Sequence, residues 1–365
     1  MTKYHYCLLL MGSLLLGSCQ SVEQLSIDYM LPAEVSFPAT LKRVAVNNMP
    51  NVPDNKLIIT EEEQKKSENE VARLTNYYNG DAAITTESLA EALANENYFE
   101  EVVICDSALR SKDINPREST LSRDEVLELT QNLDVDFLIA LENIQMRSNR
   151  KISYMPDWGV FLGTVDVKVY PTVRIYLPNR KGPMVTVNSN DSIFWEEAGN
   201  GEASVRSRLI SEEDMVKQAS EFAGTVPVRH LLPYWKTSNR YLFSGGSVNM
   251  RDAAVYAKEE NWSKAVELWK QTYETKKGKQ KMYAAYNTAL GYEMQDSIDT
   301  ALEWALKAQT LAREKSKTDK KETGEIHDGT ISYYIFISMY VDELEKRKEG
   351  MARLNMQMNR FDDDF

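Results

Sequence analysis

Cysteine and histidine are the residues of this chain that could support nucleophilic or metal chemistry, and both are scarce. The 365-residue sequence contains three of each. The cysteines are Cys7, Cys19 and Cys105, and only Cys105 lies beyond the first nineteen residues. A structural metal site needs several clustered ligands, and none stands near Cys105 in the sequence. Of the three cysteines, Cys19 is the one whose neighbouring residues indicate that its sulfur is chemically modified.

A short hydrophobic segment leads directly into Cys19. An apolar run over residues 7–16 follows a positively charged start. It has the length of a signal peptide and is too short to span a bilayer. Gly17 and Ser18 are small, so their backbone can enter a peptidase cleft. Leu16-Gly17-Ser18-Cys19 resembles the lipobox of bacterial lipoproteins, although glycine is an uncommon second residue.

This resemblance implies cleavage between Ser18 and Cys19, which removes residues 1–18 as a signal peptide. The Cys19 sulfur would then carry diacylglycerol as a thioether, and its new amino group a fatty acid such as palmitate. Two or three acyl chains hold a protein stably on a membrane. An ordinary cleaved signal and an uncleaved anchor are the alternatives. We expect a lipid-anchored protein of the cell envelope, on the outer membrane of a Gram-negative bacterium, with residues 19–25 as a tether reaching ~25 Å.

Composition places the remaining chain among water-soluble globular proteins of two domains. Hydrophobic residues make up 42% and charged residues 27%, with a net charge of −12. Because nucleic-acid binding requires a basic surface, an acidic chain argues against that partner. The net charge also predicts no general attraction to anionic lipid headgroups.

Residues 26–210 alternate between strand and helix patterns. Strands are predicted at 41–47, 101–105 and 136–141, with helices between them at 86–95 and after the capping box Ser122–Glu125. A further helix start is predicted at Thr60, before three glutamates. Strand-helix-strand-helix-strand order implies a parallel or mixed sheet. Hydrophobic residues at alternate positions over 165–177 predict a strand with one solvent-exposed face.

The rest of the chain is predicted to be helical, with connecting helices at 211–246, repeats at 247–312 and a C-terminal capping helix and tail at 325–360. The repeats follow tetratricopeptide spacing, which places small residues where helices cross. The matching residues are Ala253, Tyr256, Ala265, Trp269 and Thr272, then Ala289, Tyr292, Ala301, Ala305 and Ala308. The predicted fold class is α+β/α: a small mixed-sheet α/β domain followed by an all-α tetratricopeptide-like helical repeat domain.

Residues 40–195 resemble envelope lipoprotein domains with an anticodon-binding-like α/β fold, such as the curli-secretion lipoprotein and the lipoprotein activators of cell-wall synthases. The shared features are the lipidated cysteine, a Lys-Arg-Val-Ala-Val strand, a helix running into Asn-Tyr-Phe-Glu-Glu-Val-Val and a Val-Asp-Phe-Leu-Ile strand. The whole chain also resembles an uncharacterised family of bacterial envelope lipoproteins with C-terminal tetratricopeptide-like repeats. That family carries no assigned activity, and fold alone does not imply function.

The sequence contains no catalytic motif of the common hydrolase, zinc-protease, nucleotide-binding or dinucleotide-binding kinds. His230 lies in an apolar stretch typical of a packed core histidine, and His327 in a charged loop. We therefore expect no enzyme, no metal and no cofactor. The predicted function is a non-enzymatic protein–protein interaction or scaffold module. Alternatives are a component of an oligomeric secretion assembly, with long lipid-facing hairpins, and a cell-wall enzyme with an unrecognised motif.

The expected partners are the membrane, through the lipid, and an envelope protein or peptide, while the oligomeric state stays open. Tetratricopeptide-like repeats bind extended peptides along their inner helices. Repeat numbering predicts a peptide groove lined by Met250, Lys258, Tyr283, Tyr286, Asn287, Leu290 and Met294. The alternative is that these side chains pack against the capping helix.

Overall fold

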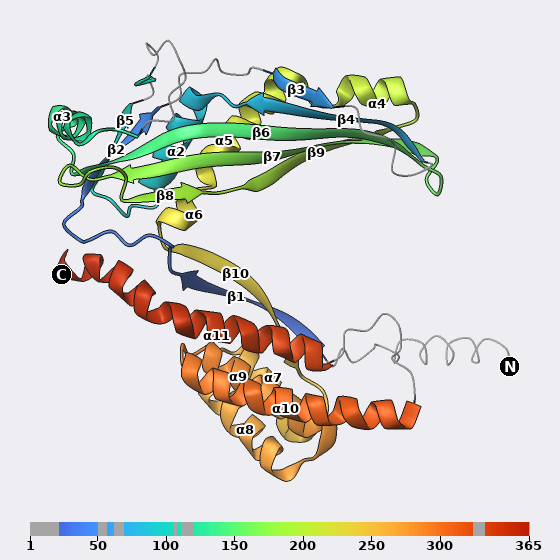
Figure 1. Cartoon of the computed structure of the whole chain (residues 1–365). Helices are drawn as coiled ribbons and strands as arrows, with labels where there is room; N and C mark the ends of the chain where they lie inside the picture. The colour runs from blue at the N-terminus through green and yellow to red at the C-terminus, as the bar shows by residue number, and fades with distance from the viewer. Residues whose placement is uncertain are drawn as a thin grey trace. The chain divides into compact units, whose positions relative to one another are not determined.

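The chain divides into two compact units, each discontinuous in sequence. The computed structural model describes residues 22–49, 57–61, 69–105, 108–110, 120–323 and 333–364. Unit 1 consists of Met1–Leu31 and Trp235–Leu354, and unit 2 of Pro32–Tyr234 and Asn355–Phe365. Unit 2 contains a mixed sheet and unit 1 is largely helical (Figure 1). The predicted order of a mixed-sheet region followed by a helical region is confirmed. Ser18 and Cys19 lie outside the described residues.

Unit 2 is built on an eight-stranded sheet among the described residues. Its strands are β2 (Arg43–Asn48), β3 (Leu57–Glu61), β4 (Glu70–Asn79), β5 (Glu101–Cys105), β6 (Phe137–Met155), β7 (Val160–Tyr176), β8 (Val185–Asn188) and β9 (Asp191–Gly199). β2 lies between β5 and β6 and runs parallel to both, as the alternation of strands and helices predicts. The other pairings are antiparallel.

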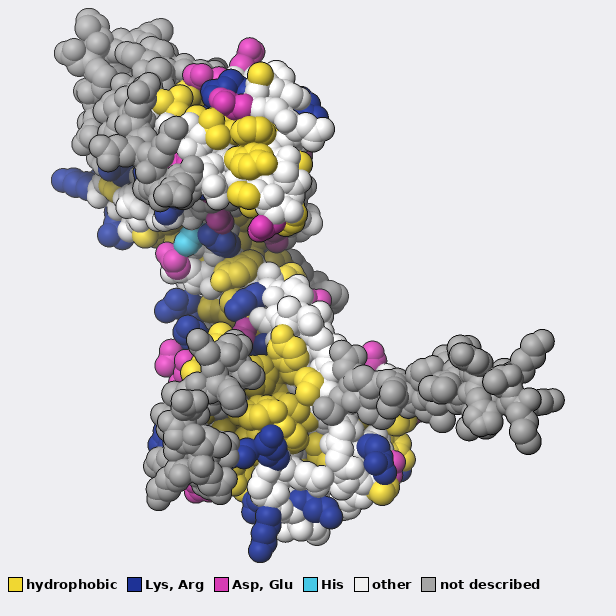
Figure 2. All heavy atoms as spheres, turned by 90° about the vertical axis from the view of Figure 1, so that its right-hand side faces the viewer, with side chains coloured by type: hydrophobic (Ala, Val, Ile, Leu, Met, Phe, Trp, Pro, Cys, Tyr) yellow, Lys and Arg dark blue, Asp and Glu magenta, His cyan; other side chains and the backbone are white. Residues whose placement is uncertain are grey.

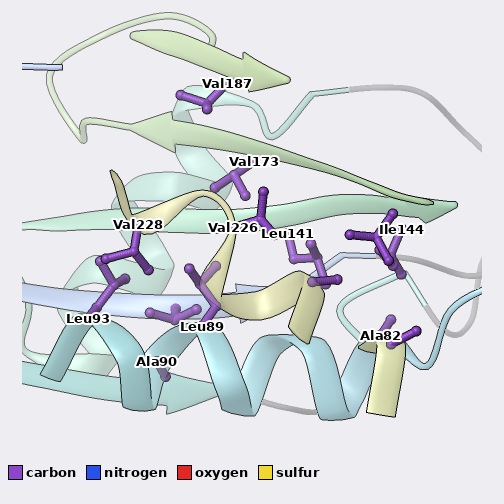
Figure 3. Packing of buried hydrophobic residues seen from close by; sticks show 14 of the residues in the cluster. Ala82, Leu89, Ala90, Leu93, Leu141, Ile144, Val173, Val187, Val226 and Val228 are labelled. Carbon is purple, nitrogen blue, oxygen red and sulfur yellow. The ribbon is translucent and has the colours of Figure 1, made fainter. Parts of the chain in front are cut away.

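One face of this sheet is covered by helices. The helices of unit 2 are α2 (Ala82–Asn95), α3 (Arg123–Leu133), α4 (Glu202–Arg208), α5 (Glu212–Thr225) and α6 (Val228–Leu231). α3 is the exception and packs on the opposite face, where its Val126 clusters with Ala45 and Leu138. Leu89 and Leu93 of α2 point toward the sheet beside Val226 and Val228 (Figure 3). α2 and α5 cross closely at Gly224, where an added Cβ would lie 2.6 Å from the Thr85 carbonyl oxygen. A side chain at this position would therefore force the two helices apart.

Three local expectations for unit 2 have clear outcomes. The capping box is present, since the Ser122 hydroxyl accepts from the Glu125 amide while the Glu125 carboxylate accepts from the Ser122 amide. The helix expected from Thr60 is wrong, because Thr60 lies in β3, which pairs with β4. Cys105 is half-buried, whereas the sequence predicts a buried strand end, because β5 is an edge strand.

Unit 1 combines a two-stranded sheet with long helices. Its elements are β1 (Val22–Leu31), β10 (Tyr234–Phe243), α7 (Val248–Lys258), α8 (Trp262–Thr275), α9 (Gly278–Glu293), α10 (Ile298–Thr323) and α11 (Tyr333–Met358), after which η1 (Asn359–Asp364) follows. α7 packs on α8, α8 on α9, and α9 on α10. Among the described residues, no helix is both long enough and apolar enough to cross a membrane.

The structure changes two predicted segment assignments. β1 begins at Val22, within the predicted tether. The predicted connection 211–246 contains the helices α5 and α6 as expected, but residues 234–243 form β10 instead of a helix. Each strand obtains its backbone hydrogen-bond partners from the other. Ser26 of β1 and Asn239 of β10, whose side chains are hydrogen-bonded, are 213 positions apart in the sequence. Because so distant a partner leaves no local pattern, the sequence reading missed the pair. β1 consequently belongs to the helical unit and not to the α/β region.

Candidate functional site

The predicted peptide groove is occupied by the chain itself, which contradicts its assignment as an open binding site. Met250, Tyr286, Asn287 and Leu290 are buried. Asn287 bonds to the backbone amide and carbonyl of Phe243 in β10, at 3.1 and 2.8 Å.

Two further groove residues, Tyr283 and Lys258, contact other residues of unit 1. Met294 is half-buried against the hydrophobic core of unit 1. The Tyr283 ring stacks on Phe243 with centroids 4.0 Å apart. Lys258 forms an ion pair with Glu23 of β1 at 2.8 Å. The predicted groove residues thus contact β10, β1 and α11 of the same unit.

A cavity of about 310 Å³ lies on one face of the unit 2 sheet. Its lining side chains come from β4, β6 and β7 and are Arg73, Arg147, Asn149, Lys151, Thr164, Asp166 and Lys168. Alternate residues of a strand point to opposite faces. The odd-numbered valines of β7 are buried in the core cluster shared with α2 and α5, so its even-numbered residues face this cavity.

Strand register sets cations directly opposite one another in this cavity. Arg147 of β6 is paired with Lys168 of β7. Two residues further along β6, Asn149 is paired with Asp166, while Lys151 is flanked by Arg73 on β4. Like charges directly opposite on neighbouring strands destabilise a sheet. The lining carries four cations and Asp166, and Glu70 neutralises Arg73, so an excess of two positive charges remains in a chain of net charge −12. This local positive site suits an anionic ligand.

The Arg73 guanidinium has a fixed position at one edge of the cavity. Its Nε and a terminal nitrogen contact both oxygens of Glu70 at 2.6 and 3.1 Å. The Glu70 side chain is 1% exposed and that of Arg73 is 11% exposed. Such a bidentate pair fixes the guanidinium plane. The lysines supply less constrained ammonium groups, so the cavity combines an oriented cation with adjustable ones.

Comparison with known sequence families gives two matches of unassigned function. Residues 41–243, just over half of the chain, match the domain of unknown function DUF8603. The chain belongs to this family. Residues 251–346 match the domain of unknown function DUF6340. None of the curated proteins and none of the solved structures compared with the chain matches it. All the cavity residues lie inside the DUF8603 match, and α8, α9 and α10 lie inside the second match.

A second polar cluster in the DUF8603 region lies at the carboxyl end of β2, where the parallel pairing of β2 with β6 ends at Leu141. The Tyr176 hydroxyl donates to a Glu142 oxygen at 2.6 Å, and Arg174 lies 3.4 Å from the other oxygen. Burial raises the pKa of Glu142 against the opposing effect of the Tyr176 hydrogen bond. The fully buried Asn47 amide has no hydrogen-bond partner among the described residues. Ligands often bind at this end of parallel strands, which makes the cluster the second candidate after the cavity.

The β6–β7 hairpin is long but does not offer a face to lipid. Val165, Val167 and Val169 of β7 are fully buried in the core cluster that contains Met215 and Ala219 of α5. The opposite face carries the charged cavity residues.

A buried charge network in unit 1 has a structural role. Glu293 of α9 accepts from Arg240 of β10 at 2.8 Å through both oxygens. It also accepts from Arg347 of α11 at 2.6 Å and from the Tyr340 hydroxyl at 2.8 Å. Arg240 additionally contacts Glu343 of α11 at 2.9 Å. Three elements are therefore held together through one carboxylate and two guanidinium groups.

Replacing Glu343 with glutamine is expected to reduce the loss of unfolding free energy that unit 1 shows as the pH falls into the acid range. Burial acts to raise the pKa of Glu343, but hydrogen bonds from Tyr29 and Ser238 and the charge of Arg240 lower it to about 2. A lowered pKa stabilises the fold fully above the ordinary value of 4.5. This stabilisation is lost as pH falls through about 2.

The expected loss in the wild type is about 1–2 kcal/mol over this range, because partial exposure screens the interaction. Urea unfolding at a series of pH values from 6 to 2, followed by hydrogen exchange of α11 peptides, measures it. An unchanged slope in the variant would show that Glu343 is not the titrating group.

The cavity residues were missed at the sequence level, although part of their signal is visible. Asp166 and Lys168 belong to the polar positions that alternate with buried valines, and the same spacing recurs at Arg147, Asn149 and Lys151. The sequence does not give the register that places Arg147 opposite Lys168. His230, expected in the core, is half-exposed and lies 2.8 Å from Glu34.

Proposed function

We propose that this protein is a lipid-anchored envelope protein that binds an anionic group of a partner through the cavity on the unit 2 sheet. The anchor is the lipid predicted on Cys19, and the role is that of a non-enzymatic interaction or scaffold module. The observation that carries the binding proposal is the pairing of cations across adjacent strands around one cavity. The ligand chemistry is a carboxylate or a phosphate, since both accept several charge-assisted hydrogen bonds.

We also infer that α7–α10 form two tetratricopeptide-like helix pairs. Support comes from the small residues at the expected crossing positions, since Ala265, Ala289, Ala301 and Ala305 are all fully buried. In addition, a Cβ on Gly291 would lie 2.4 Å from a Val266 methyl group, so α8 and α9 cross closely there. Because β1 and β10 fill the inner side of these helices, we assign the repeats to scaffolding rather than to peptide capture.

Charge reversal in the cavity tests the proposed function. Lys151→Glu is expected to weaken binding of a fluorescent hexaglutamate peptide by roughly 10- to 100-fold, as charge-assisted hydrogen bonds contribute about 1.5–3 kcal/mol. Fluorescence anisotropy at low ionic strength measures the affinity. Inorganic phosphate as a competitor separates a phosphate preference from a carboxylate preference.

Lys217→Glu is the matched control, since Lys217 is exposed on α5 and changes the net charge by the same amount. It is expected to retain the affinity of the wild type to within about twofold, because distant exposed charges are screened. Equal losses of affinity in both variants would show that net charge alone causes the effect, and the cavity would then no longer be part of the proposal. The same conclusion would follow if Lys151→Glu bound as tightly as the wild type.

A further inference from the structure

The end of unit 1 where β1 begins carries aromatic and basic side chains close together. Thr237 donates to Asp28 at 2.6 Å, and Glu23 is hydrogen-bonded to Ser244, so β1 and β10 run antiparallel. The first residues of β1 consequently lie beside the last residues of β10. Phe243, at that end of β10, stacks on Tyr283 of α9.

The first turn of α11 reaches the same place. The Tyr333 hydroxyl is hydrogen-bonded to that of Tyr283 at 2.7 Å, and its ring lies 6.3 Å from Phe243. Tyr333 and Tyr241 are each 37% exposed and Ile335 is 53% exposed. Figure 2 faces this end of unit 1, and hydrophobic side chains gather there with dark blue basic residues beside them. Tyrosine has an apolar ring and a polar hydroxyl, which suits a membrane–water interface.

Lysines lie near these rings, on the connection between α8 and α9 and in the first turn of α9. Lys276, Lys277 and Lys279 are exposed, and Lys281 is half-exposed. The Lys279 ammonium lies 5.6 Å from the Tyr333 ring centre. None of the four forms an ion pair with a carboxylate in the part of the chain that the structure describes. Each lysine near an anionic membrane contributes about 1 kcal/mol of attraction.

The length of chain between Cys19 and β1 links this surface to the predicted anchor. Only residues 20 and 21 separate Cys19 from Val22, the first residue of β1. Three steps of extended chain span at most about 11 Å. A lipid on Cys19 would therefore hold this end of unit 1 within one headgroup layer of the bilayer.

We infer that the end of unit 1 formed by Tyr241, Lys276–Lys281 and the first turn of α11 binds anionic lipid headgroups. The location of this surface at the membrane rests on the proposed anchorage at Cys19. The surface itself consists of described residues. The net charge of −12 gave no reason to expect such a surface. Four lysines within residues 276–281 produce a local positive field that the whole-chain total conceals.

Vesicle binding by the unlipidated mature chain tests the surface independently of lipidation. The chain from residue 19 onward, carrying Cys19→Ser, is mixed with phosphatidylcholine vesicles that contain either no phosphatidylglycerol or about one third. We expect binding in the presence of phosphatidylglycerol, and a loss on the order of 100-fold in Lys276→Glu/Lys277→Glu/Lys279→Glu. Cosedimentation measures the bound fraction against lipid concentration.

A second triple variant controls for net charge. Lys217→Glu/Lys264→Glu/Lys346→Glu changes three exposed lysines that are not part of this surface, Lys217 being on α5 of unit 2 and Lys264 in the first turn of α8, at the other end of that helix from Lys276. Retained binding in this variant and loss in the first supports the inference. Equal affinity for neutral and anionic vesicles, or equal loss in both triple variants, overturns it. Absence of lipid on Cys19 in cells would refute the anchorage without altering this result.

Discussion

Replacing Glu293 with glutamine is expected to destabilise unit 1 by roughly 3–5 kcal/mol, the usual cost of removing one partner from a buried ion pair. The Glu293 side chain is fully buried, and those of Arg240 and Arg347 are 3% and 8% exposed. Glutamine keeps the shape but removes the negative charge. Two guanidinium groups would then be left in the interior facing a neutral amide.

Urea unfolding followed by hydrogen exchange measures this loss in unit 1 separately from unit 2. Glu274→Gln provides the control, because Glu274 is exposed on α8, and we expect a change within about 0.5 kcal/mol. A second replacement, Arg240→Met in the Glu293→Gln background, should recover part of the stability by removing a buried cation that has lost one of its two carboxylate partners and keeps only Glu343. A loss below about 1 kcal/mol in Glu293→Gln would mean that the network is solvated in solution.

Replacing Cys19 with alanine is expected to abolish lipid attachment and to move the protein from the membrane fraction to the soluble fraction almost completely. The reason is that, in the proposed anchorage, Cys19 supplies the sulfur for the thioether, and alanine has no nucleophile. Two or three acyl chains give stable membrane attachment, whereas the described residues contain no membrane-spanning helix. Labelling with radioactive palmitate and fractionation of intact cells measure the two effects.

Cys105→Ala is the matched control and should remain labelled and membrane-bound. The intact mass of the wild-type chain separates the alternatives for its N-terminus. Loss of residues 1–18 without added acyl mass would indicate an ordinary signal peptide, and retention of residues 1–18 would indicate an uncleaved anchor. Either result would remove lipidation from the proposed function. Palmitate incorporation into Cys19→Ala would move the modification to another residue.

Local sequence signals predicted the parallel part of the unit 2 sheet correctly. The strand at 101–105 and the capping box at Ser122 depend on residues within a few positions of one another. β4 was missed because its ten residues include few buried positions and show no clean alternation. The β1–β10 pair was missed because each strand is completed only by the other.

The candidate sites show the same division between local and distant information. The seven predicted groove residues follow from repeat spacing, and spacing cannot reveal that β10 covers them. The cavity depends on the register of β6 against β4 and β7, which places Lys151 beside Arg73 from a different part of the chain. Register arises from the packing of the whole sheet on α2 and α5 and is not encoded at the lysine itself.

The chain passes between the two units three times, at Leu31, Tyr234 and Leu354. Unit 2 is closed by Gln357, whose side chain donates to the Val35 carbonyl at 2.8 Å and accepts from the Ala33 amide at 3.0 Å. During synthesis and export, neither unit can be completed until the region of α11 has emerged. β1 would be the first strand to follow Cys19 across the inner membrane. Its partner strand lies more than 200 residues later in the chain, so the edge of β1 stays unpaired until that strand has emerged.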